Sequence, residues 1–596
     1  MIHRLYHTIK HLRLDQITYR IWYKLRPPIR LEPIPLPLPI SPFKERGIKG
    51  DFPLTGEPSF LSETEVLFLN EKGNIATPAD WNNPNKTKLW IYNLHYFDDL
   101  NAKNSLDRHA IQHTLIQRWI AENPPLSGNG WEPYTLSLRL VNWIKWVLRT
   151  GAHDQHIVQS IALQAQALSK QLEYHILGNH LFANGKALVF AGCFLTGPTA
   201  EKHFKTGLRI LKREIPEQFL ADGAHFELSP MYHSILLWDM LDLYQLATIT
   251  QHSELISLRH QWETVIQKGI EWLTAMTHPD GKVSFFNDSG IGIAPKLGDI
   301  FKYAILLGIN TNRALAAIEG ESSSNSPQNK SNIAPSLSIF QPSGYTRVTT
   351  NTHSLIFDHA AIGPDYQPGH AHADTLSVEW SVGTERVLVN SGTSTYASNP
   401  ERLRQRKTAS HNTVVVNGQD SSEVWSSFRV ARRAYTRVIE SHVDGDTVSI
   451  TASHDGYARL KENVIHQREV SANANSICIH DMVTPPPTPP KIGLKGGETK
   501  FRLLSKVFSP SKERGTKGDF EATAYYHLHP DITIMIESPT TLWLTLPSGK
   551  KVHVSADSAI KIEDTTWHPR FGESIPNKRL CIQIKNNATK ISFRNS

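Results

Sequence analysis

The sequence predicts an α+β protein of two domains, an N-terminal α/α toroid (an incomplete barrel of helix pairs) followed by a C-terminal antiparallel β-sandwich. Between about residues 100 and 320, apolar residues recur three and four apart, as in LSLRLVNWIKWVL and ILLWDMLDLYQLATI. That spacing is the period of an amphipathic helix. Beyond this region the chain changes to short runs rich in β-branched residues, such as SLIFDHAA and HNTVVVNG, bounded by turn formers. No alternating strand–helix–strand unit occurs, so helices and strands are expected in separate domains.

The composition is that of a folded globular protein too long for a single core. Of the 596 residues, 39% are apolar and 20% are charged. The net charge of +7 favours an anionic partner. The chain has no zinc-finger spacing and no RNA-binding aromatic motif, so we expect no nucleic acid partner and take an anionic polysaccharide as the alternative. The three cysteines are far apart and suggest neither a disulfide framework nor a cysteine-based zinc site.

Residues 1–30 read as a basic amphipathic helix. They carry seven Lys and Arg against one Asp, and apolar residues recur at roughly helical spacing. We expect this helix to dock against the protein's own helical domain, with contact to a membrane surface as the alternative. The sequence shows no apolar window of about 20 residues, the length of a transmembrane segment. It also shows no apolar stretch and cleavage site of a secretory signal.

The expected domain boundaries follow from changes in composition. We expect a Pro-rich linker at 31–84, the toroid at 85–321, a polar linker at 322–336 and the β domain at 337–596, with an inserted loop at about 483–520. A twelve-residue peptide at 41–52 recurs at 509–520 with ten identical positions. Because insertions are cheap in surface loops, we expect both copies there, without a catalytic role.

Polar side chains gather in four stretches where core packing does not require them. Asn179 and His180 follow a glycine that we expect to break a helix, and His225, Glu227 and Tyr232 precede a strong helical pattern. Taken alone, Asn179 is better explained as a helix cap, and Tyr232 as an interface aromatic residue.

The His-Ala-His motif is harder to explain by packing. On a strand, His370 and His372 would lie on the same face. Two adjacent imidazoles repel each other when protonated, so the pair indicates a metal site or a role in proton transfer.

Taken together, these motifs resemble the bacterial heparinase II/III family. The resemblance rests on NHLFANGKALVFAG, DGAHFELSPMYHSILLWDMLDL, FNDSG, GHAHADTLS and LVNSGTSTY…ERLRQRKTASHNTVVVNG, in that order, and covers about residues 85–430. It implies an α/α toroid followed by a β-sandwich, in agreement with the periodicity. It also implies a polysaccharide lyase that cleaves a uronate-containing glycan by β-elimination.

The resemblance also implies roles for individual residues. Asn179 and His180 would neutralise the uronate carboxylate, which stabilises the charge that develops when the C5 proton leaves. Tyr232 and His370 would act as the acid and base, with His225 and Glu227 supporting them. The family often holds zinc or another divalent metal in the β domain, which here implies His372, His411 and Asn390. The family has Asp at the last of these positions, and a neutral amide is a weaker zinc ligand than a carboxylate. The site could therefore hold a metal loosely, use Asp374 differently, or have become a hydrogen-bond cluster.

Two alternatives to a lyase stay open at this point. One is a uronate C5-epimerase, which removes the same proton and returns one to the other face. The other is a glycan-binding or assembly protein without catalysis, to which Asn390 and the two inserted peptides point. The resemblance implies the bacterial cell envelope or periplasm and processing of surface polysaccharide, whereas the missing secretory signal leaves a cytoplasmic location open.

Overall fold

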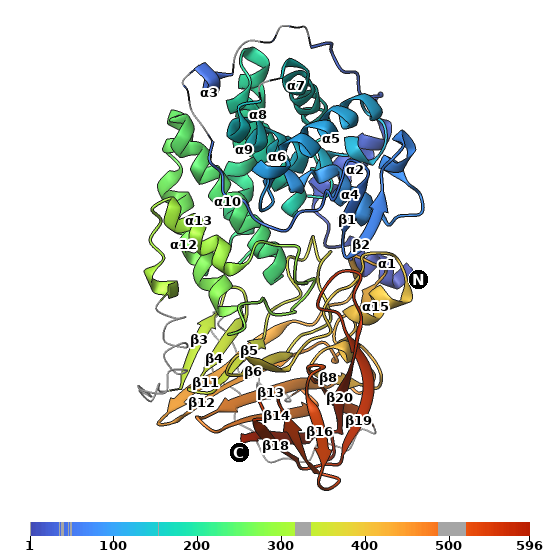
Figure 1. Ribbon diagram of the computed structural model, residues 1–596. Helices are drawn as coiled ribbons and strands as arrows, with labels where there is room; N and C mark the ends of the chain where they lie inside the picture. The colour runs from blue at the N-terminus through green and yellow to red at the C-terminus, as the bar shows by residue number, and fades with distance from the viewer. Residues whose placement is uncertain are drawn as a thin grey trace, which may run out of the picture.

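A computed structural model describes residues 2–315, 335–486 and 520–596, apart from positions 35, 37, 39, 40, 46, 48, 49 and 153. Helices form the N-terminal half, and antiparallel sheets form the C-terminal half beneath it (Figure 1). The predicted order of an α/α toroid followed by an antiparallel β-sandwich is therefore confirmed.

The helical domain is a curved array of helices that pack against one another in pairs. Its elements are α4 (Lys88–Tyr96), α5 (His109–Glu122), α6 (Pro133–Thr150), α7 (Gln155–Ser169), α8 (Gly178–Phe194), α9 (Pro198–Gln218), α10 (Pro230–Thr250), α11 (Ser253–Ile256), α12 (Arg259–Ala275) and α13 (Leu297–Leu306). A short hairpin of β1 (Glu65–Phe68) and β2 (Glu71–Asn74) precedes them.

The two central helices, α8 and α10, are buried on almost every side. Apolar residues surround both helices, which is the pattern of a helix inside a core rather than on a surface. Both helices begin close to the β domain: Gly178 at the start of α8 lies beside Gln367, and Tyr232 in the first turn of α10 stacks on His370. The residues of their first turns therefore lie at the junction of the two domains.

Among the described residues, the β domain contains three antiparallel sheets of four or more strands. The five-stranded sheet has the order β3 (Ser336–Phe340), β4 (Tyr345–Thr349), β5 (His353–Asp358), β6 (Val378–Val382) and β7 (Glu385–Leu388). The eight-stranded sheet has the order β11 (Thr436–Asp444), β12 (Thr447–His454), β13 (Ile465–Ala472), β14 (Ser476–Thr484), β21 (Ala588–Asn595), β18 (Lys551–Ala556), β17 (Thr541–Thr545) and β16 (Thr533–Ile536). The four-stranded sheet has the order β19 (Ile560–Trp567), β20 (Ile575–Gln583), β15 (Ala522–His527) and β8 (Val414–Val416). A two-stranded ribbon of β9 (Val424–Trp425) and β10 (Arg429–Val430) and a helix, α15 (Pro400–Arg406), lie beside the junction.

Two apolar clusters hold this arrangement together. One lies between the sheets and includes Phe357, Trp380 and Phe593, each fully buried. A second cluster joins Trp272 of α12 to Tyr345 of β4, so the five-stranded sheet packs on the sandwich core and on the helical domain. Burial on both sides of this sheet fixes the two domains relative to each other, which a site built from both domains requires.

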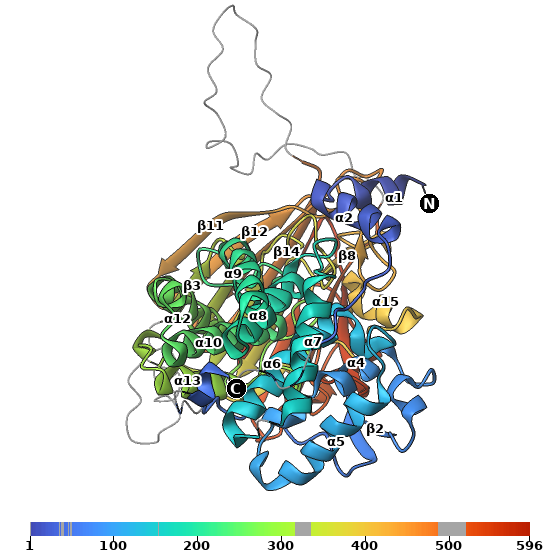
Figure 2. The same ribbon diagram turned by 90° about the horizontal axis from the view of Figure 1, so that it is seen from above.

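The N-terminal segment forms two helices rather than the single one predicted. They are α1 (Ile2–Ile9) and α2 (Leu14–Leu25), at the rim of the molecule (Figure 2). Gln16 donates hydrogen bonds to the carbonyls of Ile176 and Tyr366, so α2 touches both domains. Among the helices that the structure describes, none is long and apolar enough to cross a membrane.

The first copy of the repeated peptide is more than a surface loop. Phe43, in α3 (Pro42–Glu45), and Phe52 are each 2% exposed and pack into the helical core, and the Ser41 hydroxyl donates to the Phe194 carbonyl. The expectation of a surface loop is wrong for this copy, because it contains a short helix and its two aromatic rings fill space beside α8. The second copy, except for Phe520, and most of the expected linker at 322–336 lie outside the described residues.

Candidate active site at the domain junction

Tyr232 and His370 meet at the junction although they come from different domains. Tyr232 lies in the first turn of α10, whose N-cap Ser229 accepts a hydrogen bond from the Tyr232 amide. Its ring stacks on the His370 imidazole with centroids 3.9 Å apart, and its hydroxyl lies 3.2 Å from the Tyr396 hydroxyl. Both rings are half-buried, so a substrate can reach them.

A buried carboxylate, Asp288, organises the β-domain side of this centre. It accepts hydrogen bonds from Nδ1 of His370 at 2.9 Å and Nε2 of His372 at 2.8 Å, and both guanidinium nitrogens of Arg402 pair with it, one at 2.7 Å. Burial would raise the pKa of Asp288, but the Arg402 charge and the two histidine hydrogen bonds outweigh it and hold that pKa well below its usual range.

An ionised Asp288 fixes the tautomers of both histidines. A carboxylate only accepts hydrogen bonds, so the proton of His370 lies on Nδ1 and that of His372 lies on Nε2. The free lone pair of His370 is then on Nε2, which points toward Glu227 at 3.5 Å. His370 is thus oriented as a proton acceptor, in the way that a carboxylate orients a catalytic imidazole.

Asn179 and Glu227 lie on the toroid side of the centre. Each is 3% exposed, and neither the Asn179 Oδ1 atom nor the Glu227 carboxylate has a hydrogen-bond partner among the described residues. Burial raises the pKa of Glu227, although His370 and the backbone of Asn179 oppose this shift. A protonated Glu227 and the Asn179 amide can both donate hydrogen bonds, which is what an incoming carboxylate requires.

The other two histidines predicted on this side differ in accessibility. The His180 ring stacks on Tyr134 with centroids 4.2 Å apart, and its Nδ1 atom lies 2.9 Å from a carboxylate oxygen of Glu173. Burial alone would lower the pKa of His180, but Glu173 outweighs it and raises that pKa, so the imidazole favours the cationic form. His225 is fully buried and bonds Gln218, so it supports the loop from behind and cannot contact a substrate.

The backbone around the centre is unusual. Leu177, Leu228, Asn287 and Leu376 all have φ between 55° and 69°, and each lies within two residues of Asn179, Glu227, Asp288 or Asp374. Leucine rarely adopts this left-handed conformation, and such strain persists only where the surroundings enforce it. Glycine is required at position 178 for two reasons. Its φ is 57°, and a Cβ there would lie 2.4 Å from the Gln367 side chain across the domain junction.

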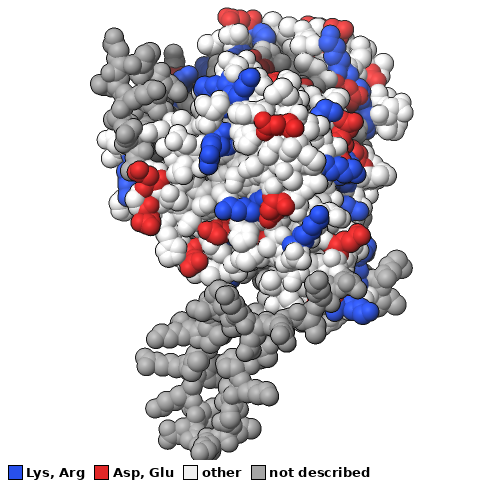
Figure 3. Space-filling model, turned by 90° about the horizontal axis from the view of Figure 1, so that it is seen from below, with Lys and Arg blue, Asp and Glu red and all other residues white. Residues whose placement is uncertain are grey.

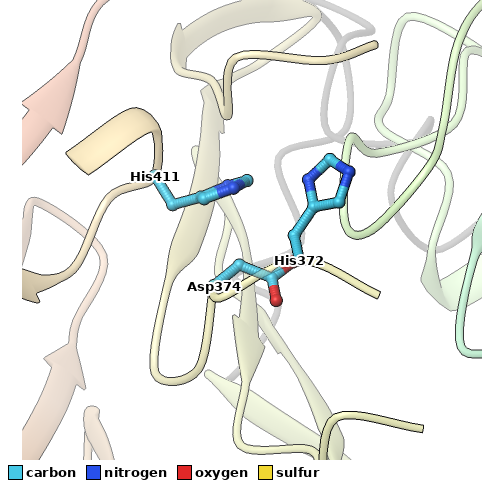
Figure 4. Close-up of side chains that lie close together, drawn as sticks. All are labelled: His372, Asp374 and His411. Carbon is cyan, nitrogen blue, oxygen red and sulfur yellow. The ribbon is translucent and has the colours of Figure 1, made fainter. Parts of the chain in front are cut away.

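A second cluster, formed by His372, Asp374 and His411, lies behind His370. Their ligand atoms lie within 4.8 Å of one another, and the three side chains point toward a common space (Figure 4). The Nδ1 atom of His372 and both ring nitrogens of His411 are buried without a hydrogen-bond partner among the described residues. Burial lowers the pKa of His372 to about 4 and that of His411 to about 3, so both imidazoles are neutral at pH 7 and can bind a metal.

The donor set fits zinc, with a different third ligand from the one expected. Two imidazoles and a carboxylate are ordinary zinc ligands. His372 also donates a hydrogen bond to Asp288, and metal-binding histidines are usually oriented by a hydrogen bond of this kind. Asn390 was expected here, but its Oδ1 accepts a hydrogen bond from the Asn412 amide and its Nδ2 faces Ser377. The carboxylate of Asp374 takes the place that the sequence assigned to Asn390.

The sequence prediction of site residues missed Asp288, Tyr396 and Arg402, and it named Asp374 only as an alternative in the metal site. All four lie within the motifs FNDSG, GHAHADTLS, VNSGTSTY and ERLRQRK, which were noted for their resemblance. Nothing in the spacing reveals that Asp288 pairs with a residue 114 positions away.

The fold and the centre together define a toroid-plus-sandwich protein with a polar site at the domain junction. Residues 116–302 match the family described as heparinase II/III N-terminus, and residues 333–596 match heparinase II/III-like, C-terminal. The chain therefore belongs to the heparinase II/III family.

Individual relatives are more distant. A heparin-sulfate lyase of Bacteroides thetaiotaomicron is 28% identical over 194 residues, which are 29% of this chain and 27% of that protein. One from Bacteroides stercoris is 23% identical over 52% of this chain and 44% of that protein. The chain thus matches less than half the length of these curated relatives. A crystal structure of heparinase III superposes with a TM-score of 0.65 at 16% identity, over 97% of this chain and 89% of the other, which supports the shared fold.

Proposed function

We propose that this protein is a polysaccharide lyase that cleaves an acidic, uronate-containing glycan by β-elimination. The observation that carries the proposal is the stacked pair of Tyr232 and His370, with the His370 lone pair facing the unpartnered polar groups of Glu227 and Asn179. Family membership and the heparin-sulfate lyases among its relatives support it.

The first step is to neutralise the uronate carboxylate at C6. The Asn179 amide donates a hydrogen bond to it, and Glu227, whose pKa is raised by burial, donates another when it is protonated. His180, whose pKa is raised by Glu173, adds positive charge nearby when it is protonated. These groups stabilise the negative charge that develops on the carboxylate when the C5 proton leaves, as oxyanion-hole donors do. Because they are fixed before the substrate binds, little reorganisation is needed during the reaction.

The second step removes the C5 proton and breaks the C4–O4 bond. Nε2 of His370 takes the proton, the electrons of the C5–H bond form the C4–C5 double bond, and the C4–O4 bond breaks. Tyr232 gives its phenolic proton to O4, which leaves as a new hydroxyl. Burial and the neighbouring Tyr396 raise the pKa of Tyr232 well above its usual value, so it enters the reaction as an acid. Proton transfer from the imidazolium to the phenolate then restores both residues.

A divalent metal in the β domain fits this scheme as a structural element. His372, Asp374 and His411 would hold it, and when bound it supplies positive charge that fixes the loop carrying His370. Asp288 bonds both His370 and His372, so the metal ligands and the proposed base share one support.

The substrate class follows from the charges on the toroid side. Burial raises the pKa of Tyr134, and the nearby Asp239, Glu173 and Asp98 carboxylates raise it further. Lys186, the cation next to this group, already pairs with Asp239 and Asp242. Sulfate groups would meet carboxylates there, so we propose a glycan whose charge comes from uronate alone. We place it among the surface polysaccharides of the bacterial cell envelope, following the family resemblance.

The test is an absorbance assay with purified protein and a set of uronate polymers, including an unsulfated glucuronate–hexosamine polymer, its sulfated form and alginate. The proposal predicts ultraviolet absorbance from the new C4–C5 double bond, fastest with an unsulfated polymer. Measurable binding without any cleavage would reject a lyase in favour of a glycan-binding protein. Deuterium uptake from heavy water into an uncut polymer would instead support C5 epimerisation.

A further inference from the structure

The apolar face of the second N-terminal helix points away from the protein. Leu14, Ile17, Ile21 and Leu25 recur along one side of α2, and they are 80%, 36%, 54% and 77% exposed. A surface helix of a globular protein normally turns such a stripe toward the core. This helix does the opposite.

The polar and aromatic face of α2 makes the contacts with the rest of the chain. Gln16 is 2% exposed and bonds two carbonyls, Tyr19 stacks on Tyr174 at 4.7 Å, and the Tyr23 hydroxyl donates to the Leu172 carbonyl. These contacts hold α2 in place while its apolar side stays in water. The helix is therefore docked on the protein, and its exposed apolar stripe is a fixed feature of the fold.

The neighbouring helix extends the same surface. In α1, Leu5, Tyr6 and Ile9 are also exposed, and Trp22 of α2 is 55% exposed. Eight of the large apolar side chains that are exposed in the described residues fall within residues 5–25. A concentration of this kind marks a docking surface, because single exposed apolar residues are otherwise scattered.

A positively charged groove lies at the end of this surface. It has a volume of about 510 Å³ and is lined by Trp22, Arg26, Arg30 and Lys170 together with two prolines. Arg26 and Lys170 donate hydrogen bonds to backbone carbonyls, and Arg26 also lies over the Tyr23 ring. Among the described residues, Arg26, Arg30 and Lys170 form no ion pair with a carboxylate. Residues 1–30 also hold seven Lys and Arg against Asp15 alone.

The charge of the N-terminal helices is not a general property of the surface. On the face seen from below in Figure 3, Lys and Arg are interspersed with Asp and Glu. The apolar stripe is complementary to a lipid acyl layer, and the neighbouring cations are complementary to anionic lipid head groups.

We propose that α1 and α2 dock this protein onto an anionic phospholipid membrane, with the apolar stripe entering the acyl boundary and the Arg26, Arg30 and Lys170 groove binding lipid phosphates. The docking would keep the chain at the membrane surface, where α2 also touches the carbonyl of Tyr366 in the β-domain loop that leads to His370. This proposal is independent of the proposed lyase activity.

The experiment is vesicle flotation with the full chain. We expect binding to vesicles of phosphatidylglycerol and phosphatidylethanolamine and little binding to phosphatidylcholine alone. An Ile17→Ser/Ile21→Ser variant should bind at least about tenfold more weakly, because it removes the centre of the stripe. An Arg30→Gln/Lys170→Gln variant should bind about 25-fold more weakly, since each cation near an anionic surface contributes about fivefold.

The matched control is a Met535→Ser/Ile536→Ser variant in β16, where the two side chains are 55% and 67% exposed. Because Ile17 and Ile21 are 36% and 54% exposed, the control removes at least as much exposed apolar surface elsewhere, and it should bind vesicles like the unchanged protein. Equal loss in the control, or no binding of the unchanged protein to anionic vesicles, would overturn the proposal. A dimer in solution that the Ile17→Ser/Ile21→Ser variant abolishes, without vesicle binding, would instead assign the surface to a second copy of the chain.

Discussion

Replacing Tyr232 with phenylalanine separates the proposed proton donor from its structural surroundings. The substitution keeps the ring, whose centroid lies 3.9 Å from that of His370, and removes one hydroxyl, which forms a hydrogen bond of 3.2 Å with the Tyr396 hydroxyl. Losing that hydrogen bond should cost about 0.5–1.5 kcal/mol of stability. Losing a general acid should slow the reaction by about 10²–10⁴-fold.

Tyr396→Phe is the matched control, because it removes the other half of the same hydrogen bond. Both variants should unfold at nearly the same urea concentration, and Tyr396→Phe should lose less than about tenfold in rate, which corresponds to one hydrogen bond. The assay is the initial rate of absorbance increase on a uronate polymer. For Tyr232→Phe we expect kcat to fall with KM nearly unchanged, because the proton moves only in the transition state. Equal losses in both variants would refute a specific role for Tyr232.

Three further predictions concern the β-domain side of the site. Arg402→Met leaves the buried Asp288 carboxylate without its cation, so urea unfolding should show a loss of about 3–5 kcal/mol, and a loss below about 1 kcal/mol would contradict the pairing. Zinc at a hundredfold excess over its dissociation constant should raise the free energy of unfolding by about 2.7 kcal/mol, and Asp374→Asn should reduce that gain. Burial lowers the pKa of His411 from 6.5 to about 3, so the stability from its neutral form is complete above pH 6.5 and is lost as the pH falls toward 3. With a chelator present, His411→Gln should remove about 1.4 kcal/mol per pH unit from this slope, and an unchanged slope would rule out the buried neutral imidazole.

The fold could be predicted from the sequence because it depends on local patterns. Helical spacing in α6 and α10 and alternation in the β-domain strands each extend over a few consecutive residues. Asn179 and Tyr232 were identified through the ordered motifs that resemble the family, because each residue alone is better explained as a helix cap or an interface aromatic residue.

Asp288 could not be identified in this way. It lies in a loop between α12 and α13, and its partners His370 and Arg402 are 82 and 114 residues away in the chain. Only the folded packing of the two domains brings these charges together, and a single sequence carries no record of that pairing. The same reason explains why Asp374 was not identified as the third ligand: Asn390 was assigned from the family's motif, and only the folded packing brings Asp374 beside His411.

The N-terminal helices show how a correct local pattern can mislead about packing. The apolar period of residues 1–30 predicted an amphipathic segment, and an amphipathic segment normally docks by its apolar face. In α2 the aromatic residues Tyr19 and Tyr23 supply the contacts instead, which leaves the aliphatic side exposed. Helical periodicity reveals that two faces differ, and the surrounding structure decides which of them is buried.

The most direct test of the central claim is the mass of the products formed from an unsulfated uronate polymer in heavy-oxygen water. Elimination breaks the C4–O4 bond without adding water, so the new non-reducing end should lack one water relative to a hydrolysis product and should contain no heavy oxygen. Products that carry a complete added water with heavy oxygen would contradict the account, because they would assign Tyr232 and His370 to hydrolysis rather than to proton abstraction at C5.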